Sequence, residues 1–209
     1  MHIARIFCNH CVMTIELLTA LTLYAFVTSV TPGPNNLMLM SSGANFGFSR
    51  SIPHMTGVGL GFGFMVFLVG IGLAGLFHAL PHSDLVLKVA SVAYMLYLAW
   101  KIAGSGGMGD ADNRGAPMTF LQAAAFQWVN PKAWSMALAS ISLYAASQSL
   151  WAVTVVAVVF TLVNLPSVSI WVVAGTQLKR LLSSPERLRL FNWAMAALLV
   201  LSLIPVLRH

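Results

Sequence analysis

The sequence predicts an all-helical integral membrane protein, and three observations support this fold class. Apolar residues make up 58% of the chain and charged residues only 8%, whereas soluble domains carry roughly 25% charged residues. The apolar residues form long stretches, close to the roughly 20 residues that a helix needs to cross a bilayer. Between these stretches the basic residues occur singly or in pairs. A soluble fold of 209 residues could not hide this much apolar surface from water, so we expect a bilayer to cover it.

Six apolar stretches are long enough to be transmembrane helices. We place them at residues 17–42, 55–80, 84–104, 118–146, 150–178 and 187–207. The long polar connection at 105–117 is typical of a flexible linker, and it divides the chain into halves of three spans each, 17–104 and 118–209. Because each half holds an odd number of spans, the halves must lie in opposite orientations. Such an inverted repeat is a common plan of secondary transporters, which bind their substrate near the middle of the membrane.

Residues 1–16 precede the first span and are predicted to be a poorly ordered leader. Their apolar run is broken by Asn9 and His10, which makes them a poor signal peptide, and Met13 is a plausible alternative start. Cys8 and Cys11 form a lone CxxC pattern and are the two cysteines of the chain. We therefore expect neither a disulfide framework nor a metal site in this leader.

The first span contains a motif that should break its helix. The motif reads Thr31-Pro32-Gly33-Pro34-Asn35-Asn36. Each proline removes a backbone N–H donor and clashes with the carbonyl four residues earlier, and the glycine between them is conformationally permissive. In lipid, the freed backbone groups are tolerated only where protein or a water-filled cavity covers them. We expect a half-helix to begin near Pro34 and to direct its N-terminal dipole at an anionic group.

The fourth span contains a second break, in the corresponding place of the second half. Its notable residues are Gln127, Asn130, Pro131 and Lys132. A charge near the middle of a bilayer is costly and is normally retained for function, so Lys132 is the sharpest indication of a site. Because we expect no Asp or Glu at the same depth, its partner is either a backbone carbonyl freed by the breaks or a carboxylate of the substrate. A lysine that snorkels to the membrane interface is the alternative.

Uncharged polar residues beside the two breaks complete the candidate substrate site. Asn35, Asn36, Gln127 and Asn130 can both donate and accept hydrogen bonds towards an amino-acid backbone. They could equally serve to satisfy the broken helices. The sequence leaves both roles open for each of them.

For two further features we predict a role in helix packing or conformational change. Gly57 and Gly61 lie among small residues at fourfold spacing in the second span, which lets helices approach closely in lipid. Helix packing is therefore favoured over ligand contact. In the fifth span, Asn164 and Pro166 mark a third interruption, a single proline kink. For it we favour a change of conformation over substrate binding.

The basic residues predict the orientation in the membrane. The connections after the odd-numbered spans hold Arg50, Lys101, Arg114, Lys179, Arg180, Arg187 and Arg189. The opposite side holds Arg5, Lys88 and Arg208. Because Lys and Arg gather in cytoplasmic connections, we expect the odd-numbered connections in the cytoplasm and both termini outside.

Several partners are not expected. The basic residues form no stripe that would bind nucleic acid. His54, His78 and His82 are expected at the membrane interfaces, too peripheral to hold a metal ion within the membrane. No phosphate-binding glycine loop or zinc motif occurs in the sequence, so we expect no cofactor.

Two other functions stay open for this chain. One is an exporter of another small solute or of a metal cation. The other is an intramembrane hydrolase in which Ser41, Ser42 or Ser135 would act as a nucleophile with Lys132 as its base.

At the two breaks the chain resembles the lysine exporter (LysE/RhtB) family of bacterial amino-acid exporters. The resemblance covers nearly the whole chain from about Thr14, and its specific marks are the 31–35 motif and Asn130-Pro131-Lys132. Its supporting marks are Gly57-Val58-Gly59-Leu60-Gly61 and Ala93-Tyr94-Met95-Leu96-Tyr97-Leu98-Ala99-Trp100. It implies a multi-pass protein of the bacterial inner membrane that exports amino acids or close derivatives by proton antiport. It implies no cofactor and leaves a homo-oligomer open.

One departure from the family narrows the expected substrate. Many members carry an acidic residue just after the second-span glycines, where this chain has Phe62. The departure argues against basic amino acids. The doubled Asn35-Asn36 and Leu60-Gly61-Phe62 look more like the cysteine/O-acetylserine exporter branch. This implies a small, neutral, zwitterionic substrate, with homoserine, threonine and branched-chain amino acids left open.

Overall fold

The computed structural model describes residues 14–73, 82–105, 116–146, 149–182, 184–204 and 207. The α-helices among them are α1 (Ile15–Val30), α2 (Pro34–Phe46), α3 (Phe48–Leu68), α5 (Ser83–Ala103), α6 (Phe120–Phe126), α7 (Pro131–Tyr144), α8 (Leu150–Leu181) and α9 (Pro185–Leu201). A π-helical turn, η1 (Val69–Leu73), follows α3, and a 3₁₀ turn, η3 (Gln127–Val129), joins α6 to α7. The described part of the chain is therefore all-helical, as predicted. Of the predicted leader 1–16, residues 1–13 with both cysteines lie outside the described residues, while α1 already begins at Ile15. Residues 106–115 of the predicted linker also lie outside them.

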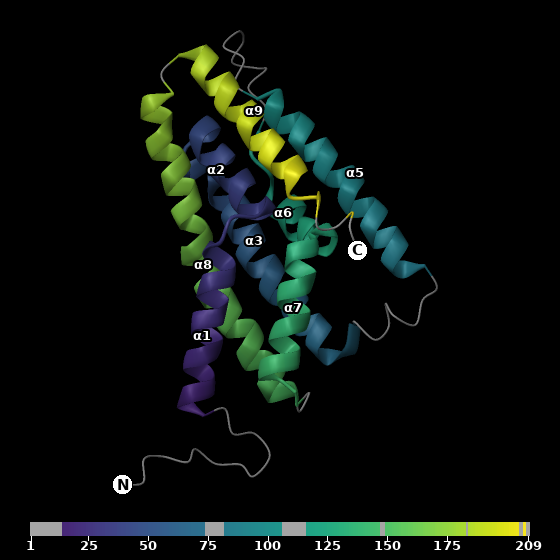
Figure 1. Cartoon of the computed structure of the whole chain (residues 1–209). Helices are drawn as coiled ribbons and strands as arrows, with labels where there is room; N and C mark the ends of the chain where they lie inside the picture. Colours follow the sequence, from purple (N-terminus) through teal and green to yellow (C-terminus); the bar gives the residue numbers. More distant parts are fainter. Residues whose placement is uncertain are drawn as a thin grey trace.

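The long helix α8 organises the bundle. It is 32 residues long and packs against α1, α2 and α3. Figure 1 shows α1 beside one half of α8 and α2 beside the other, while α5 and α9 run together along the opposite side. The apolar interior is divided into two clusters. One contains residues of α2, α5, α6 and α9, and the other contains residues of α1 and α7.

Among the described residues, three helices have the length and apolarity to cross a membrane, and a bent pair makes a fourth span if it is counted as one. Three are single helices, at Phe48–Leu73, Leu85–Ala103 and Leu150–Lys179. The fourth is the pair Ile15–Val30 and Pro34–Phe46, bent by 57° at the break. The remaining two predicted spans are the broken segment α6–η3–α7 and the 17-residue α9, which are shorter pieces. The count of six spans and the inverted relation of the two halves stay predictions.

Two features of the helices differ from the prediction. The second span begins at Phe48, seven residues before the predicted start at 55. Arg50 was placed in the connection before it, but α3 includes this residue and also accommodates Pro53 within its second turn. In the fifth span, α8 continues without a break through Pro166, which lies on an exposed face of the helix. The third interruption is therefore not a helix break.

Small residues let α3 approach its neighbours closely. A Cβ added at Gly61 would lie 2.6 Å from Cα of Ala124, and one added at Gly57 would collide with the backbone of Phe120. Both neighbours belong to α6, so these two glycines hold α3 against α6. Helix packing is thus the contact they make in this structure, in keeping with their fourfold spacing.

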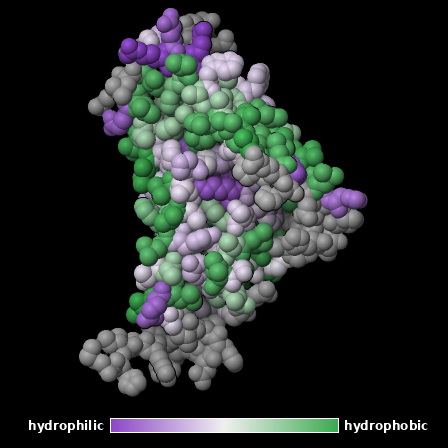
Figure 2. All heavy atoms as spheres, in the orientation of Figure 1, coloured by the Kyte–Doolittle hydropathy of each residue, from purple (hydrophilic) through white to green (hydrophobic). Residues whose placement is uncertain are grey.

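The surface has the pattern of a protein embedded in lipid. Figure 2 shows hydrophobic residues over much of the face, with hydrophilic ones gathered at the end where α8 turns into α9. A small hydrophilic patch lies near the middle of the same face, between the hydrophobic areas. Such a patch at mid-depth is expected where broken helices line a polar cavity.

Candidate functional site

The two breaks, far apart in the sequence, meet in the structure around one small cavity. The cavity measures about 20 Å³, and six predicted residues line it: Gly33, Asn35, Asn36, Asn130, Lys132 and Asn164. It is also lined by residues that the sequence did not single out as binding groups, namely Thr28, Ser29, Phe62, Met136 and Val168. Space of this size is enough for about one water molecule. In this conformation the space is therefore too small for an amino acid.

Both breaks are built in the same way, with a proline starting the second half-helix. Pro34 opens α2 after the extended Gly33, and Pro131 opens α7 after the extended Asn130. Proline suits the first helical position because its missing N–H would have no partner there anyway. The Asn130 side chain caps α7 by accepting a hydrogen bond from N of Lys132 at 3.1 Å. The N-terminus of α2 has no side-chain cap, so its amides remain available to a ligand.

Side chains satisfy the carbonyls that the first break frees at the end of α1. The amide of Asn36 donates to the carbonyls of Ser29, at 2.8 Å, and Thr31, at 2.7 Å. The indole of Trp171, on α8, donates to the carbonyl of Val30 at 3.0 Å. An unpaired carbonyl inside a membrane is costly, so these contacts explain how the broken helix is stable there. Asn36 thus has the structural role that the sequence left open.

Lys132 crosses from the second break to the first. Its Nζ donates to the carbonyl of Thr31 at 2.8 Å, to the Thr31 hydroxyl at 2.9 Å and to the carbonyl of Pro32 at 3.3 Å. Its stem lies over Gly33, where an added Cβ would be 2.7 Å from Cδ of Lys132. In this conformation the lysine therefore pairs with carbonyls freed by the break, one of the two partners expected from the sequence.

A second contact between the breaks is a reciprocal amide pair. Nδ2 of Asn35 donates to Oε1 of Gln127 at 2.8 Å, and Nε2 of Gln127 donates back to Oδ1 of Asn35 at 3.2 Å. Gln127 also donates to the carbonyl of Ala123 at 2.8 Å. Its side chain is completely buried. The pair joins the start of α2 to η3 and helps to keep the cavity closed.

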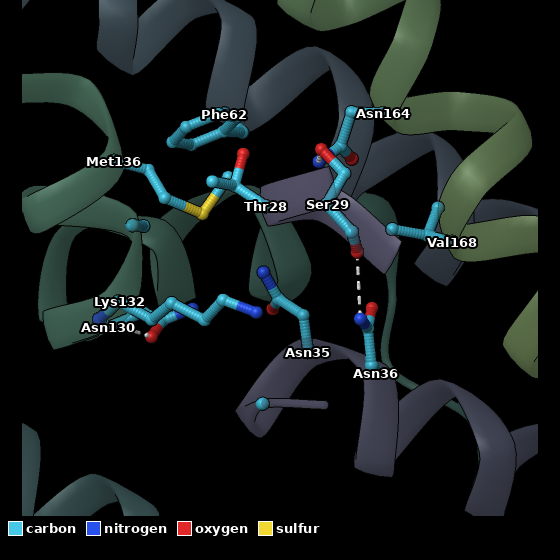
Figure 3. Close-up of a pocket in the computed structure, with 12 residues that line it drawn as sticks. Thr28, Ser29, Asn35, Asn36, Phe62, Asn130, Lys132, Met136, Asn164 and Val168 are labelled. Carbon is cyan, nitrogen blue, oxygen red and sulfur yellow. Dashed lines mark hydrogen bonds between the residues drawn. The ribbon is translucent and has the colours of Figure 1, made fainter. Parts of the chain in front are cut away.

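Across the cavity from Lys132 lies a buried acceptor without a partner. Asn164 of α8 donates through Nδ2 to the Ser29 hydroxyl at 3.1 Å, but its Oδ1 is buried and accepts no hydrogen bond. Figure 3 shows Lys132 and Asn35 on one side of the cavity, with Ser29 and Asn164 on the other. The site thus offers a cation on one side and an unused acceptor on the other. Buried polar atoms are rarely left unpaired, and such an exception calls for an explanation.

Some of these residues could not be found from sequence patterns. Thr28 and Ser29 lie in an ordinary apolar helix, and only the position of the break two residues later places them at the cavity. Trp171 gave one weak signal, because a buried indole N–H in an apolar span needs an acceptor. Phe62 was noted for its difference from the family, and the structure places its ring in the cavity wall.

The structure shows that His54 is buried. Its ring is 2% exposed and lies inside the protein. Because α3 starts earlier than predicted, His54 belongs to this helix and lies on its buried side. His82 is exposed just before α5, and His78 lies outside the described residues. Among the described residues, no group of three His, Cys, Asp or Glu side chains converges as a metal site would require.

The serine–lysine pair of the hydrolase alternative is not formed in this structure. The Ser135 hydroxyl donates to the backbone carbonyl of Lys132 at 3.0 Å, while the ammonium of that lysine is bonded to Thr31 and Pro32. Ser42 is paired with Ser51 at 2.8 Å. No serine hydroxyl among these is therefore activated by the lysine.

Comparison with known proteins identifies the family of the chain. Residues 26–203 match the LysE type translocator family. The chain is 33% identical over 193 residues to the cysteine/O-acetylserine efflux proteins of Escherichia coli strain K12 and Shigella sonnei, covering 90% of this chain and 96% of theirs. No solved structure matches the chain. The family consists of membrane translocators rather than enzymes. The chain is a multi-pass membrane protein that belongs to the LysE type translocator family.

Proposed function

We propose that this protein is a secondary exporter of small, neutral amino acids or their close derivatives, of the cysteine/O-acetylserine kind. Two groups that face the same small cavity support this proposal. Lys132 is held there by neutral oxygens only, and Asn164 presents a buried acceptor without a partner. A zwitterion has the anion and the cationic donor that these two groups lack.

Substrate binding exchanges partners at the first break. The substrate carboxylate pairs with the Lys132 ammonium and with the free amides at the N-terminus of α2, where the helix dipole also favours an anion. The carbonyls of Thr31 and Pro32 then lose the lysine, and the substrate ammonium takes its place on them and on Asn164. The exchange leaves no carbonyl unpaired and no net charge added to the membrane interior, which favours a neutral zwitterion over a plain cation or anion.

The cavity walls support a small neutral substrate. Among the described residues, no Asp or Glu lines the cavity. Phe62, whose ring lines it, stands where many family members carry an acidic residue. A second ammonium or guanidinium, as in a basic amino acid, would have no counter-ion there. The cysteine/O-acetylserine efflux proteins are the relatives that the chain matches at 33% identity, and both of these substrates are small and zwitterionic.

Transport requires the cavity to open, since about 20 Å³ does not admit an amino acid. Opening towards either side separates Asn35 from Gln127 and frees Lys132 from the first break. The two halves, arranged as an inverted repeat, would rock about this site and expose it alternately. In the inner membrane of a bacterium, with the odd-numbered connections in the cytoplasm, this moves substrate outwards against an inward flow of protons.

The proposal is tested by measuring which amino acids accumulate outside cells. Cells without their own exporters would carry the intact protein, Lys132→Met, Lys179→Met or an empty vector. Lys179 is exposed near the end of α8 and controls for the loss of one positive charge. Mass spectrometry of the medium should show one or a few neutral amino acids with the intact protein and Lys179→Met, but not with Lys132→Met. Accumulation of no amino acid by the intact, membrane-inserted protein would refute the function.

A further inference from the structure

A second cavity, separate from the breaks, lies at the other end of α2. It measures about 50 Å³ and is formed by α2, α3, α5 and the residues just before α6. The polar residues lining it are Ser41, Ser42, His54, Lys101 and Ser105. Because α2 is 13 residues long and rises about 1.5 Å per residue, the two cavities are roughly 10–15 Å apart along this helix. The second one lies towards the connections that follow the odd-numbered spans.

His54 is the unexplained group in this cavity. Its side chain is 2% exposed, and neither Nδ1 nor Nε2 has a hydrogen-bond partner. Among the described residues, the one other side chain with such a buried, unpaired atom is Asn164, in the candidate substrate site. Burying an imidazole without any hydrogen bond is costly. The ring therefore has an unused N–H donor at the edge of a space that could hold its acceptor.

The other groups around the cavity define what that acceptor would be. Lys101 brings a positive charge, and no acidic side chain of the described residues lines the space. The hydroxyls of Ser42 and Ser105 are already bonded, to Ser51 at 2.8 Å and to the carbonyl of Lys101 at 2.8 Å. The unused donors are therefore the Lys101 ammonium, the imidazole N–H and the Ser41 hydroxyl, which only accepts a hydrogen bond, from Asn45 at 3.3 Å. A small anion with two oxygens fits such a set of donors.

We propose that this cavity is a carboxylate-binding site, in which Lys101 and His54 each donate to the carboxylate of a small organic acid. A volume of about 50 Å³ admits roughly three water-sized groups, which is the number of heavy atoms in a carboxylate. Met38 and Phe46 supply an apolar wall for the carbon attached to it. The nearest source is the exported amino acid itself, which would meet this site before it reaches the breaks. That assignment of the source, unlike the site, rests on the proposed function and orientation.

Nitrogen NMR of the full-length protein, labelled with ¹⁵N-histidine in lipid nanodiscs, tests the site directly. The His54 signal is identified by its loss in His54→Gln, and His82→Gln serves as the exposed control. Acetate and O-acetylserine are the probes, and serine amide, which lacks the carboxylate, is the negative probe. We expect the first two to shift the His54 signal and serine amide to leave it unchanged. Lys101→Met should weaken the effect about 10- to 100-fold, the loss of one charge-assisted hydrogen bond, whereas Lys179→Met should not.

Three results would overturn the proposal: no shift with either carboxylate, an equal shift with serine amide, or an undiminished shift in Lys101→Met. A shift with both carboxylates, together with a higher half-saturating internal substrate concentration for export by Lys101→Met, assigns the site to the exported amino acid. A shift with acetate alone assigns it to a separate small carboxylate. Acetate binding to a protein that exports no amino acid would keep this site and remove the proposed function. Export of amino acids by a protein whose His54 signal does not shift would keep the proposed function and remove this site.

Discussion

Replacing Gly33 by alanine should displace Lys132 without disturbing the backbone. The backbone of Gly33 is extended, a conformation that alanine adopts freely, so no strain arises there. The new Cβ, however, would lie 2.7 Å from Cδ and 3.1 Å from Nζ of Lys132. Ordinary contact begins near 3.4 Å, so the lysine stem must move by several tenths of an ångström. The flexible side chain yields before the backbone does.

The size of the effect follows from the bonds that the ammonium makes. A displacement of this size should first break the longest of them, the 3.3 Å bond to the carbonyl of Pro32. Loss of one charge-assisted hydrogen bond costs about 1.5–3 kcal/mol. Because substrate binding releases this same bond in the proposed exchange, its loss destabilises the substrate-free protein, and the half-saturating substrate concentration should not rise.

The assay combines thermal unfolding in detergent with export kinetics, and it has a matched control. Gly104 follows α5 with 3.6 Å of room to the nearest atom, so Gly104→Ala changes the same atoms without a collision. Gly104→Ala should unfold and export as the intact protein does, whereas Gly33→Ala should unfold at a lower temperature without a rise in its half-saturating substrate concentration. Unchanged stability in Gly33→Ala would refute the close contact of Lys132 with the first break.

Three further predictions concern the contacts that hold the breaks. Trp171→Phe removes the donor to the last carbonyl of α1 and should lower the free energy of unfolding by about 1–3 kcal/mol. The control Trp193→Phe, at a 60% exposed position, should have little effect. Equal unfolding temperatures for the two variants would contradict the role of the Trp171 indole. Alanine at Asn35, Gln127 or both should give a coupling energy of about 0.5–3 kcal/mol in a double-mutant cycle of unfolding, and additive effects would contradict the amide pair. Gly175→Ala places a Cβ against the backbone of α2, so the amount of folded protein recovered from membranes should fall sharply, and normal recovery would show that α2 and α8 are not in close contact.

Sequence patterns revealed the helix breaks because prolines act locally. A proline excludes its own N–H and the preceding helical turn wherever the chain lies, so Pro34 and Pro131 could be placed as helix starts without a fold. The polar identity of Asn35, Asn36 and Lys132 likewise marked the site, because such side chains are costly in lipid.

Other features depend on contacts that no local pattern contains. Asn36, Trp171 and Lys132 share the carbonyls of one break, although they come from three different helices. Which carbonyl each side chain reaches depends on how α7 and α8 pack against α1. The burial of His54 was missed for a related reason. Arg50 suggested a connection, whereas α3, which packs against α2, α6 and α8, includes this residue.

We propose that Lys132 exchanges the carbonyls of the first break for the carboxylate of the substrate. The most direct test is counterflow in proteoliposomes, comparing the exported amino acid with its own carboxamide, which keeps the ammonium and loses the negative charge. The intact protein should prefer the amino acid by about 10-fold or more, and Lys132→Met should lose that preference while Lys179→Met keeps it. A preference for the carboxylate that survives unchanged in Lys132→Met would show that another group binds it.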